Sequence, residues 1–309
     1  MLTTVVTGGA GFIGSHLSEE LAQAGYRVII FDDLSAGKEE NIAALLKRSN
    51  VEFIKGSIND PPLLGKVFQG VHYVFHLAAI TSVFRSVGEP LASHDVNATG
   101  TLNVLLAARD NHVSKVIYAS SSSVYGDTPT LPKKEGMTTQ PLSPYAVAKL
   151  AGEHYCGAFK EVYGLDTICL RYFNVYGPRQ DPNSQYAAVI PRFIQSIGEG
   201  SPPVIFGDGE QTRDFTFVKD VVTANILAAQ SDASGTFNAS RGESVTINQL
   251  AELIIELIGN RIKPVHQEPR PGDIRDSLAD CSKAEAFGYR SQYDIKTGLN
   301  ETVRWYLGG

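Results

Sequence analysis

Short apolar runs alternate with amphipathic stretches along the first half of the chain. The run Val28–Phe31 is continuously apolar, which is typical of a strand buried on both faces of a parallel sheet. Comparable runs predict strands at residues 2–7, 26–33, 51–54, 71–79, 115–121 and 166–174. Helical spacing of apolar residues predicts helices at residues 12–25, near 39–48, before Gly70, at 92–111 and at 144–163. This alternation predicts an α/β fold with a doubly wound parallel sheet.

After Asn174 the alternation gives way to proline-rich turns and shorter elements. We predict strands at residues 202–206 and 235–240, and helices near 189–199, 220–230 and 247–258. We interpret residues 1–173 as a domain built on the main sheet. Residues 174–309 then form a smaller α/β domain whose loops enclose a substrate, and a segment near residues 212–240 is expected to return to the first domain.

The composition narrows the class of protein. The chain has 309 residues, a formal net charge of −6 and a pI near 5.7, which argues against a nucleic-acid partner. No apolar run approaches the roughly 20 residues that span a membrane. The first strand begins at once, without a signal peptide, so we expect a cytoplasmic protein. Cys156, Cys169 and Cys281 are far apart and lie in no metal-binding pattern, so we expect reduced thiols and no metal site.

Three glycines follow the first predicted strand. Gly8, Gly11 and Gly14 lie in the stretch TGGAGFIG, between a strand and a helix. Glycines at such a turn let backbone N–H groups and the helix N-terminus approach a phosphate. The GxxGxxG spacing differs from the more common GxGxxG pattern, so the motif alone is only suggestive. A second feature is needed to assign the ligand.

That second feature is an acidic pair at the end of the next predicted strand. Asp32 and Asp33 follow the glycines at the distance at which a carboxylate accepts hydrogen bonds from an adenosine ribose. A carboxylate there would also repel a 2′-phosphate. The glycines and Asp32 together predict a nicotinamide-dinucleotide site that favours NAD over NADP.

A tyrosine and a lysine in a predicted helix are the candidate chemistry. Tyr145 and Lys149 are four residues apart, so both side chains lie on one face of the helix. A cation beside a phenol stabilises the phenolate and is expected to lower the pKa of Tyr145, which makes it a candidate general base. Ser121 ends a predicted strand, where its hydroxyl would project into the crevice in which such sheets bind ligands.

Together these motifs resemble the extended short-chain dehydrogenase/reductase superfamily, in its UDP-sugar 4-epimerase family. The stretches LAA (77–79), NATGT (97–101), RYFNVYGPRQDPN (171–183), TRDFTFVKD (212–220) and RPGD (270–273) also match. The resemblance covers nearly the whole chain. It implies a Rossmann fold, an NAD-binding first domain and a UDP-sugar-binding second domain. It also implies a catalytic group formed by Ser121, Ser122, Tyr145 and Lys149.

The resemblance also implies binding residues. NAD would contact Gly8, Gly11, Phe12, Ile13, Gly14, Asp32, Asp33, Leu34, Ser35, Ala36, Gly37, Lys38, Ser57, Ile58, Leu77, Ala78, Ala79, Thr81, Asn97, Ala119, Tyr145, Lys149, Tyr172 and Val175. The UDP-sugar would contact Thr81, Val83, Ser121, Ser122, Tyr145, Asn174, Gln180, Ala188, Val189, Val204, Ile205, Phe206, Arg213, Arg270, Asp273 and Ser277. Among these, Arg213 and Arg270 are fork-shaped donors suited to a diphosphate.

The residues after Ser121 bear on the reaction. Dehydratases of this branch carry an Asp-Glu pair where this chain has Ser122 and Ser123, and decarboxylases carry Glu in place of Ser123. The resemblance therefore implies a redox-neutral 4-epimerase, which reduces its own 4-keto intermediate and retains NAD between turnovers. A nucleotide-sugar 4-ketoreductase is an alternative reading, and a non-enzymatic NAD-sensing protein is disfavoured by the intact serine, tyrosine and lysine.

Two residues bear on which UDP-sugar is the substrate. The chain most resembles epimerases of UDP-N-acetylglucosamine, and Ser277 stands where enzymes restricted to UDP-glucose carry a bulky tyrosine. Thr81 departs from that group, whose members carry glycine there, so action on both UDP-hexose types is expected. A UDP-glucuronate 4-epimerase is the alternative, with Arg85 or Arg179 meeting the carboxylate. The resemblance also implies a homodimer that pairs helices 92–111 and 144–163.

Overall fold

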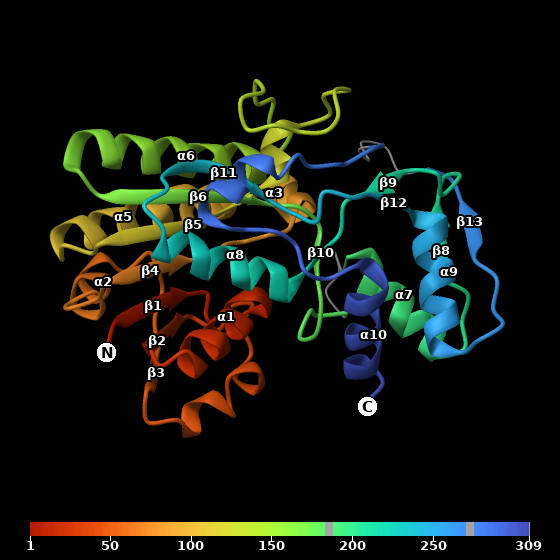
Figure 1. Cartoon of the computed structure of the whole chain (residues 1–309), viewed down its shortest axis with the longest axis horizontal. Helices are drawn as coiled ribbons and strands as arrows, with labels where there is room; N and C mark the ends of the chain where they lie inside the picture. Colours follow the sequence, from red (N-terminus) through yellow and green to blue (C-terminus); the bar gives the residue numbers. More distant parts are fainter. Residues whose placement is uncertain (183–187, 270–274, 309) are drawn as a thin grey trace.

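The computed structural model describes residues 1–182, 188–269 and 275–308, and its centre is a parallel sheet of seven strands (Figure 1). The strand order is β11-β6-β5-β4-β1-β2-β3. The strands are β1 (Thr3–Thr7), β2 (Arg27–Asp32), β3 (Val51–Lys55), β4 (Tyr73–His76), β5 (Lys115–Ser121), β6 (Asp166–Tyr172) and β11 (Gly235–Ala239). All neighbouring pairs are parallel, which confirms the predicted doubly wound α/β fold.

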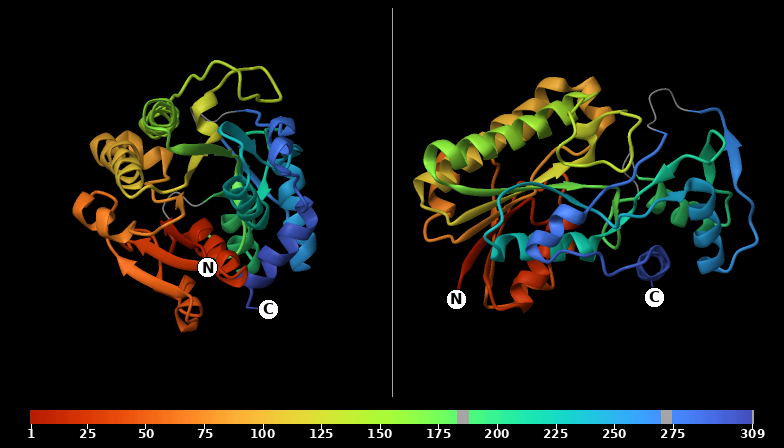
Figure 2. Two further views of the ribbon diagram at one scale, coloured as in Figure 1. Left: turned by 60° about the vertical axis from the view of Figure 1, so that its left-hand side comes forward. Right: turned by 45° about the horizontal axis from the view of Figure 1, so that its top comes forward.

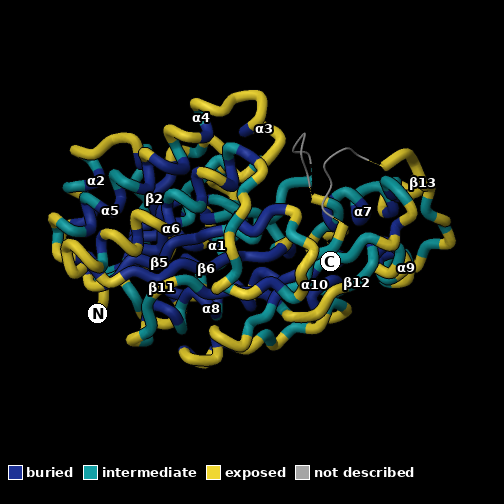
Figure 3. Tube along the Cα trace, turned by 90° about the horizontal axis from the view of Figure 1, so that it is seen from above, coloured by how far each residue is buried: buried dark blue, intermediate teal, exposed yellow. Residues whose placement is uncertain are grey.

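Helices cover both faces of this sheet (Figure 2). Alternate residues of each strand point to opposite faces, so Val5 and Val6 of β1 belong to different apolar clusters. One face packs on α1 (Phe12–Gln23) and α8 (Val218–Gln230). The other packs on α2 (Pro61–Val67), α5 (Gly100–Asp110) and α6 (Pro144–Tyr163). The inner strands are therefore buried on both sides, as their apolar sequence requires, whereas the edge strand β3 is only partly buried (Figure 3).

Beside this sheet lies a smaller unit with a separate apolar cluster. Its helices are α7 (Val189–Gly198), α9 (Ile247–Ile258) and α10 (Ile295–Tyr306). Its short strands are β7 (Val175–Tyr176), β8 (Val204–Phe206), β9 (Thr212–Arg213), β10 (Thr216–Phe217), β12 (Val245–Thr246) and β13 (Val265–Gln267), which pair as β10-β7, β12-β9 and β13-β8. The second unit thus supplies a small α/β layer next to the carboxyl end of β6.

Several elements differ from the sequence expectation. The helix expected near residues 39–48 is two short 3-10 turns, Glu39–Asn41 and Leu45–Lys47. The helix expected at 92–111 is α4 (Pro90–His94), a π-helical turn at Asp95–Thr99 and then α5, and it is preceded by α3 (Val83–Gly88). Within the described residues, no helix is both long and apolar enough to cross a membrane.

Candidate active site

The glycine-rich turn between β1 and α1 is packed too closely for side chains. Gly8 has φ +68, and a Cβ there would lie 2.7 Å from the backbone nitrogen of Ala78. A Cβ on Gly14 would lie 2.1 Å from the carbonyl oxygen of Gly8. Gly11 is the N-cap of α1 and supplies no capping side chain, and the first turn, which includes Phe12 and Ile13, has no acidic residue. The helix N-terminus can therefore receive an anionic phosphate, so the residues present fit a dinucleotide.

Asp32 lies directly against this turn. Its carboxylate accepts hydrogen bonds from the backbone amides of Ala10 at 3.0 Å and Leu34 at 2.8 Å. Burial raises the pKa of Asp32, while these two hydrogen bonds oppose the shift. The backbone amide of Lys38 also donates to the carbonyl of Ala10 at 3.0 Å. The predicted loop of Asp33, Leu34, Ser35, Ala36, Gly37 and Lys38 is thus folded beside the glycines.

A second group of predicted cofactor residues lies after β3 and β4. The amide of Leu77 donates to the carbonyl of Thr7 at 3.1 Å, which keeps the segment Leu77–Thr81 beside β1. Asn97 is 1% exposed, and its side-chain amide binds both the N–H (2.8 Å) and the carbonyl (2.9 Å) of Ile80. Asn97 therefore holds the predicted cofactor segment through Ile80. The remaining members of the group, Ser57 and Ile58, follow β3, where the Ile58 carbonyl accepts a hydrogen bond from Asn103.

The predicted catalytic residues meet where β5 ends against α6. The Lys149 ammonium donates to the carbonyl of Ala119 at 2.8 Å and lies 6.0 Å from the centre of the Tyr145 ring. The Ser121 hydroxyl hydrogen-bonds the Tyr145 side chain, and it accepts the amide of Ser123 at 3.2 Å. Ser122 begins the 3-10 turn Ser122–Tyr125 that follows β5. The structure therefore brings the serine, the tyrosine and the lysine together.

Burial shifts the pKa values of both Tyr145 and Lys149. Burial raises the pKa of Tyr145 above its usual value of 10.0, and the Ser121 hydrogen bond opposes that shift. Burial also lowers the pKa of Lys149 to about 8. The expected lowering of the Tyr145 pKa by Lys149 is therefore wrong for the chain by itself, because both groups are removed from water.

Tyr172, at the end of β6, is the next predicted cofactor residue. Its hydroxyl is joined to the side-chain amide of Asn225 from α8, with contacts of 2.9 and 2.7 Å. Sequence analysis missed Asn225, which is fully buried and has no motif of its own. Val175 follows in β7, which pairs with β10.

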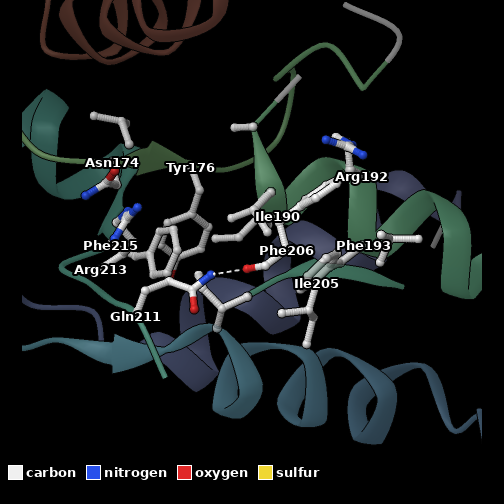
Figure 4. A pocket seen from close by; sticks show the side chains of 15 residues that line it. Asn174, Tyr176, Ile190, Arg192, Phe193, Ile205, Phe206, Gln211, Arg213 and Phe215 are labelled. Carbon is white, nitrogen blue, oxygen red and sulfur yellow. Dashed lines mark hydrogen bonds between the residues drawn. The ribbon is translucent and has the colours of Figure 1, made fainter. Parts of the chain in front are cut away.

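A cavity of about 270 Å³ lies in the smaller unit, starting at Asn174 and Val175 just after β6 (Figure 4). Eight predicted residues line it: Asn174, Val175, Ala188, Val189, Val204, Ile205, Phe206 and Arg213. Lining residues that sequence analysis missed are Tyr176, Ile190, Arg192, Phe193, Gln211, Phe215 and Ile247. Most of these are apolar and resemble ordinary core positions in the sequence. The lining combines an apolar wall with two arginines, which suits a base joined to a diphosphate.

The other predicted substrate residues that the structure describes do not line this cavity. The amide of Ser277 donates to the carbonyl of Thr212 at 3.2 Å, which places Ser277 next to Arg213. Gln180 donates to the carbonyl of Val175 at 3.2 Å. Thr81 and Val83 are exposed where α3 begins. Arg270 and Asp273 lie outside the described residues.

Comparison with known proteins assigns the family. The model of the NAD dependent epimerase/dehydratase family matches residues 4–240. The chain belongs to this family. It is 40% identical to the UDP-glucose 4-epimerase of Mycolicibacterium smegmatis, over 99% of this chain and 98% of that protein. Membership confirms the predicted family and the NAD cofactor.

Two solved structures of epimerases are closely similar. One is the UDP-N-acetylglucosamine 4-epimerase from Methanobrevibacter ruminantium in complex with UDP-N-acetylmuramic acid, with a TM-score of 0.97, 46% identity, and 99% and 98% of the two chains covered. The other is the UDP-glucose 4-epimerase of Thermus thermophilus in complex with NAD, with a TM-score of 0.91, 35% identity and both chains covered fully. The Rossmann-type architecture of this epimerase is thereby confirmed.

His76 of this epimerase is a buried histidine at the end of β4. It is 1% exposed, and its ring nitrogens contact the hydroxyls of Thr7 at 2.8 Å and Thr101 at 3.0 Å. Burial, followed by the charge of Lys149, lowers the pKa of His76 to about 3. His76 is therefore a buried packing residue of the sheet. Among the described side chains, no group of three or more His, Cys, Asp or Glu could hold a metal ion.

Proposed function

We propose that this chain is a redox-neutral 4-epimerase of UDP-hexoses, acting on UDP-N-acetylglucosamine and UDP-N-acetylgalactosamine and on UDP-glucose and UDP-galactose. The observation that carries the proposal is the meeting of Ser121, Tyr145 and Lys149 at the end of β5. The cavity lined by Asn174 and Val175, which follow β6, is suited to a nucleoside diphosphate and supports it. The known relatives named above are epimerases of both sugar types.

In this mechanism the chain moves one proton at C4 of the sugar. The Tyr145 phenolic oxygen takes the proton of the C4 hydroxyl, and Ser121 hydrogen-bonds the Tyr145 side chain. After the 4-keto sugar has turned over, Tyr145 returns the proton to the C4 oxygen, and C4 is inverted because its hydrogen comes back on the opposite face. Lys149 supplies positive charge close to the phenol. A bound NAD would supply the acceptor and the donor of the C4 hydride. Gly8, Gly11, Gly14 and Asp32, with the segments after β2 and β4, would hold it.

Two ion pairs argue against the alternative substrate, UDP-glucuronate. Arg85 was a candidate partner for the sugar carboxylate, but its Nε lies 2.9 Å from Glu89. Arg179 was the other candidate, and its Nη2 lies 2.5 Å from Glu19. A substrate carboxylate at either position would therefore have to share the guanidinium with a protein carboxylate of the same charge. Ser277 lies beside Arg213, and its small side chain would leave room for a 2-N-acetyl group, which supports an N-acetylated substrate.

We also propose a cytoplasmic homodimer. Five apolar side chains on α3, α4 and the start of α6 are more than half exposed: Phe84, Val87, Leu91, Leu142 and Val147. Figure 3 shows the exposed turns of α3 and α4 together. Pairing with the same face of a second chain would bury them. The cytoplasmic assignment rests on the free thiols of Cys156, Cys169 and Cys281, which suit a reducing compartment.

The test is incubation of the purified protein, without added cofactor, with UDP-N-acetylglucosamine, UDP-glucose or UDP-glucuronate. Chromatographic separation of the C4 epimers and absorbance at 340 nm are followed together. Conversion of the first two sugars without net absorbance change supports the proposal. Conversion of UDP-glucuronate alone would replace it with the alternative substrate, and a net absorbance change would indicate a ketoreductase. Tyr145→Phe is the matched inactive variant, and it should retain UDP-sugar binding.

A further inference from the structure

Directly beneath the candidate catalytic residues lies a buried ion pair. Two nitrogens of the Arg171 guanidinium bind the Glu153 carboxylate. Nε donates to Oε1 at 2.8 Å, and Nη2 donates to Oε2 at 2.7 Å. The two side chains are each 5% exposed. Ser120 also donates from Oγ to Oε1 at 2.5 Å. A pair held by three hydrogen bonds out of contact with water has a fixed geometry.

The strand register explains why these groups meet. Ser120 of β5 and Arg171 of β6 are directly opposite each other in the parallel pairing. Both side chains reach Glu153 on α6, which lies along these two strands in Figure 1. The carboxylate therefore joins one helix to two neighbouring strands. The next pair in the register is Ser121 and Tyr172, which are candidate catalytic and cofactor residues.

Glu153 also shares a helix face with the catalytic pair. Tyr145, Lys149 and Glu153 follow one another at four-residue spacing in α6. Each contacts the end of β5: Tyr145 bonds Ser121, Lys149 bonds the Ala119 carbonyl, and Glu153 bonds Ser120. Three successive helical turns are thus attached to three successive strand residues. Movement of Glu153 would shift the two catalytic side chains relative to Ser121.

The surroundings of Lys149 give this arrangement an electrostatic role. The titratable and charged groups around it are His76 of β4, Tyr118 of β5, Tyr145, Cys156 and Glu153 of α6, and Arg171 of β6. Burial lowers the pKa of Lys149 to about 8, and the electrostatic influences of Cys156 and Glu153 raise it in part. Burial keeps His76 neutral, because it lowers the pKa of the imidazole to about 3. Among these residues, Glu153 carries the carboxylate, whose negative charge favours the charged form of Lys149.

We propose that Glu153, fixed in place by Arg171 and Ser120, is a positioning residue that keeps Lys149 charged and aligned with Tyr145. The inference rests on the proposed catalytic role of Tyr145 and Lys149. Without the carboxylate, a desolvated ammonium would more readily lose its proton. Without Arg171, the carboxylate itself would be buried without a counter-ion.

The test follows the protonation of Lys149 in the protein as purified. Lysine labelled with ¹³C at Cε is titrated by NMR, and the Lys149 signal is assigned by its loss in Lys149→Arg. Glu153→Gln should lower the titration midpoint by about one pH unit, because Arg171 then acts without its counter-ion. Arg171→Met should raise the midpoint by less, since the carboxylate remains. The acid limb of the pH profile of kcat should move in the same direction as the midpoint in each variant.

A merely structural role gives a different result. In that case both variants lose stability and kcat while the midpoint stays unchanged, and this overturns the proposal. If one single variant does not fold, Glu153→Gln/Arg171→Met removes both charges and should restore folding with a midpoint between those of the single variants. A midpoint at or above the wild-type value in Glu153→Gln also overturns it. Arg27→Met, at the exposed Arg27–Glu52 pair, is the control and should leave the midpoint unchanged.

The NMR titration needs no turnover. If the wild-type protein shows the expected titration but converts no UDP-sugar, the proposed function fails while the coupling of Glu153 to Lys149 stands. If it converts the sugar and Glu153→Gln leaves the titration unchanged, the coupling fails alone.

Discussion

The carboxylate of Asp32 accepts a hydrogen bond from the backbone amide of Ala10 at 3.0 Å. This contact joins the end of β2 to the glycine-rich turn, and the other carboxylate oxygen accepts the amide of Leu34. The residue that is expected to bind the adenosine ribose therefore also shapes the turn that is expected to bind the pyrophosphate. A change at Asp32 should affect both parts of the cofactor site.

Asp32→Asn should weaken NAD binding by about tenfold or more. The new NH₂ group would face a backbone N–H that now donates to a carboxylate, and a hydrogen bond to a charged group contributes about 1.5–3 kcal/mol. The NAD content of the purified protein and its thermal unfolding midpoint measure the effect. Asp232→Asn is the control, since Asp232 is exposed, follows α8 and is not among the predicted cofactor residues. Equal losses in both variants would contradict the role given to Asp32.

Gly14→Ala should destabilise the protein by about 1–3 kcal/mol, the usual cost of overpacking, and should reduce its NAD content. The added Cβ would lie 2.1 Å from the Gly8 carbonyl oxygen, so the helix would have to shift. Chemical denaturation measures the free energy of unfolding. Gly65→Ala is the matched control, because its Cβ meets nothing within 4 Å in α2. That variant should be unchanged or stabilised by up to about 1 kcal/mol.

Most of the main sheet was predictable because each strand has its own apolar run and turn signals. The predicted strands 2–7, 51–54 and 115–121 agree with β1, β3 and β5 within a residue or two. The helix expected at 92–111 was predicted without its interruption at Asp95–Thr99. There the side chain of Asn97 binds the backbone of Ile80, which lies outside the helix. The apolar periodicity of residues 92–111 carries no information about that contact, so it could not reveal the interruption.

The site was predictable where residues act through motifs, and less so where they act through packing. The glycines and the Ser121, Tyr145 and Lys149 group follow from spacing and resemblance. Asn225, Gln211 and Phe215 do not, because their roles depend on which distant elements meet. The division into residues 1–173 and 174–309 remains a prediction. The place of β11 in the main sheet supports the expected return of residues 212–240 to the first domain.

Asp214 should make the stability depend on pH. It is fully buried, and Oδ2 accepts the amides of Gly242 at 3.1 Å and Ala279 at 3.0 Å. Burial raises the pKa of Asp214 from 3.8 to about 6. The folded state therefore binds the proton more tightly than the unfolded state. The resulting stabilisation is complete below pH 4 and is lost as the pH rises through about 6.

Asp214→Asn cannot titrate and should remove this dependence. The free energy of unfolding of the wild type, minus that of the variant, should fall by about 2.4 kcal/mol between pH 4 and pH 7. Urea denaturation at a series of pH values gives this difference. A difference that stays constant with pH would contradict the raised pKa of Asp214, whatever the absolute stability of the variant.

Leu91→Glu and Val147→Glu should convert the proposed homodimer to monomers. Leu91 is 78% exposed and Val147 is 53% exposed. A charge at either position would be buried against its symmetry partner in a two-fold interface. Analytical ultracentrifugation measures the mass in solution. Leu46→Glu, at an exposed leucine away from this face, should remain dimeric. A monomeric wild type would contradict the homodimer directly.

Ser277→Tyr should reduce kcat/KM for UDP-N-acetylglucosamine at least about tenfold more than for UDP-glucose. The amide of Ser277 bonds the Thr212 carbonyl, so the new ring would start beside Arg213, at the wall of the cavity. It would occupy space that a 2-N-acetyl group needs when the sugar turns over, whereas a 2-hydroxyl needs less room. Steady-state kinetics with both substrates provides the measurement. Ser201→Tyr, at an exposed position outside the cavity lining, should leave the ratio unchanged. An equal fall for both sugars would mean that position 277 affects the diphosphate site as a whole and does not select the sugar.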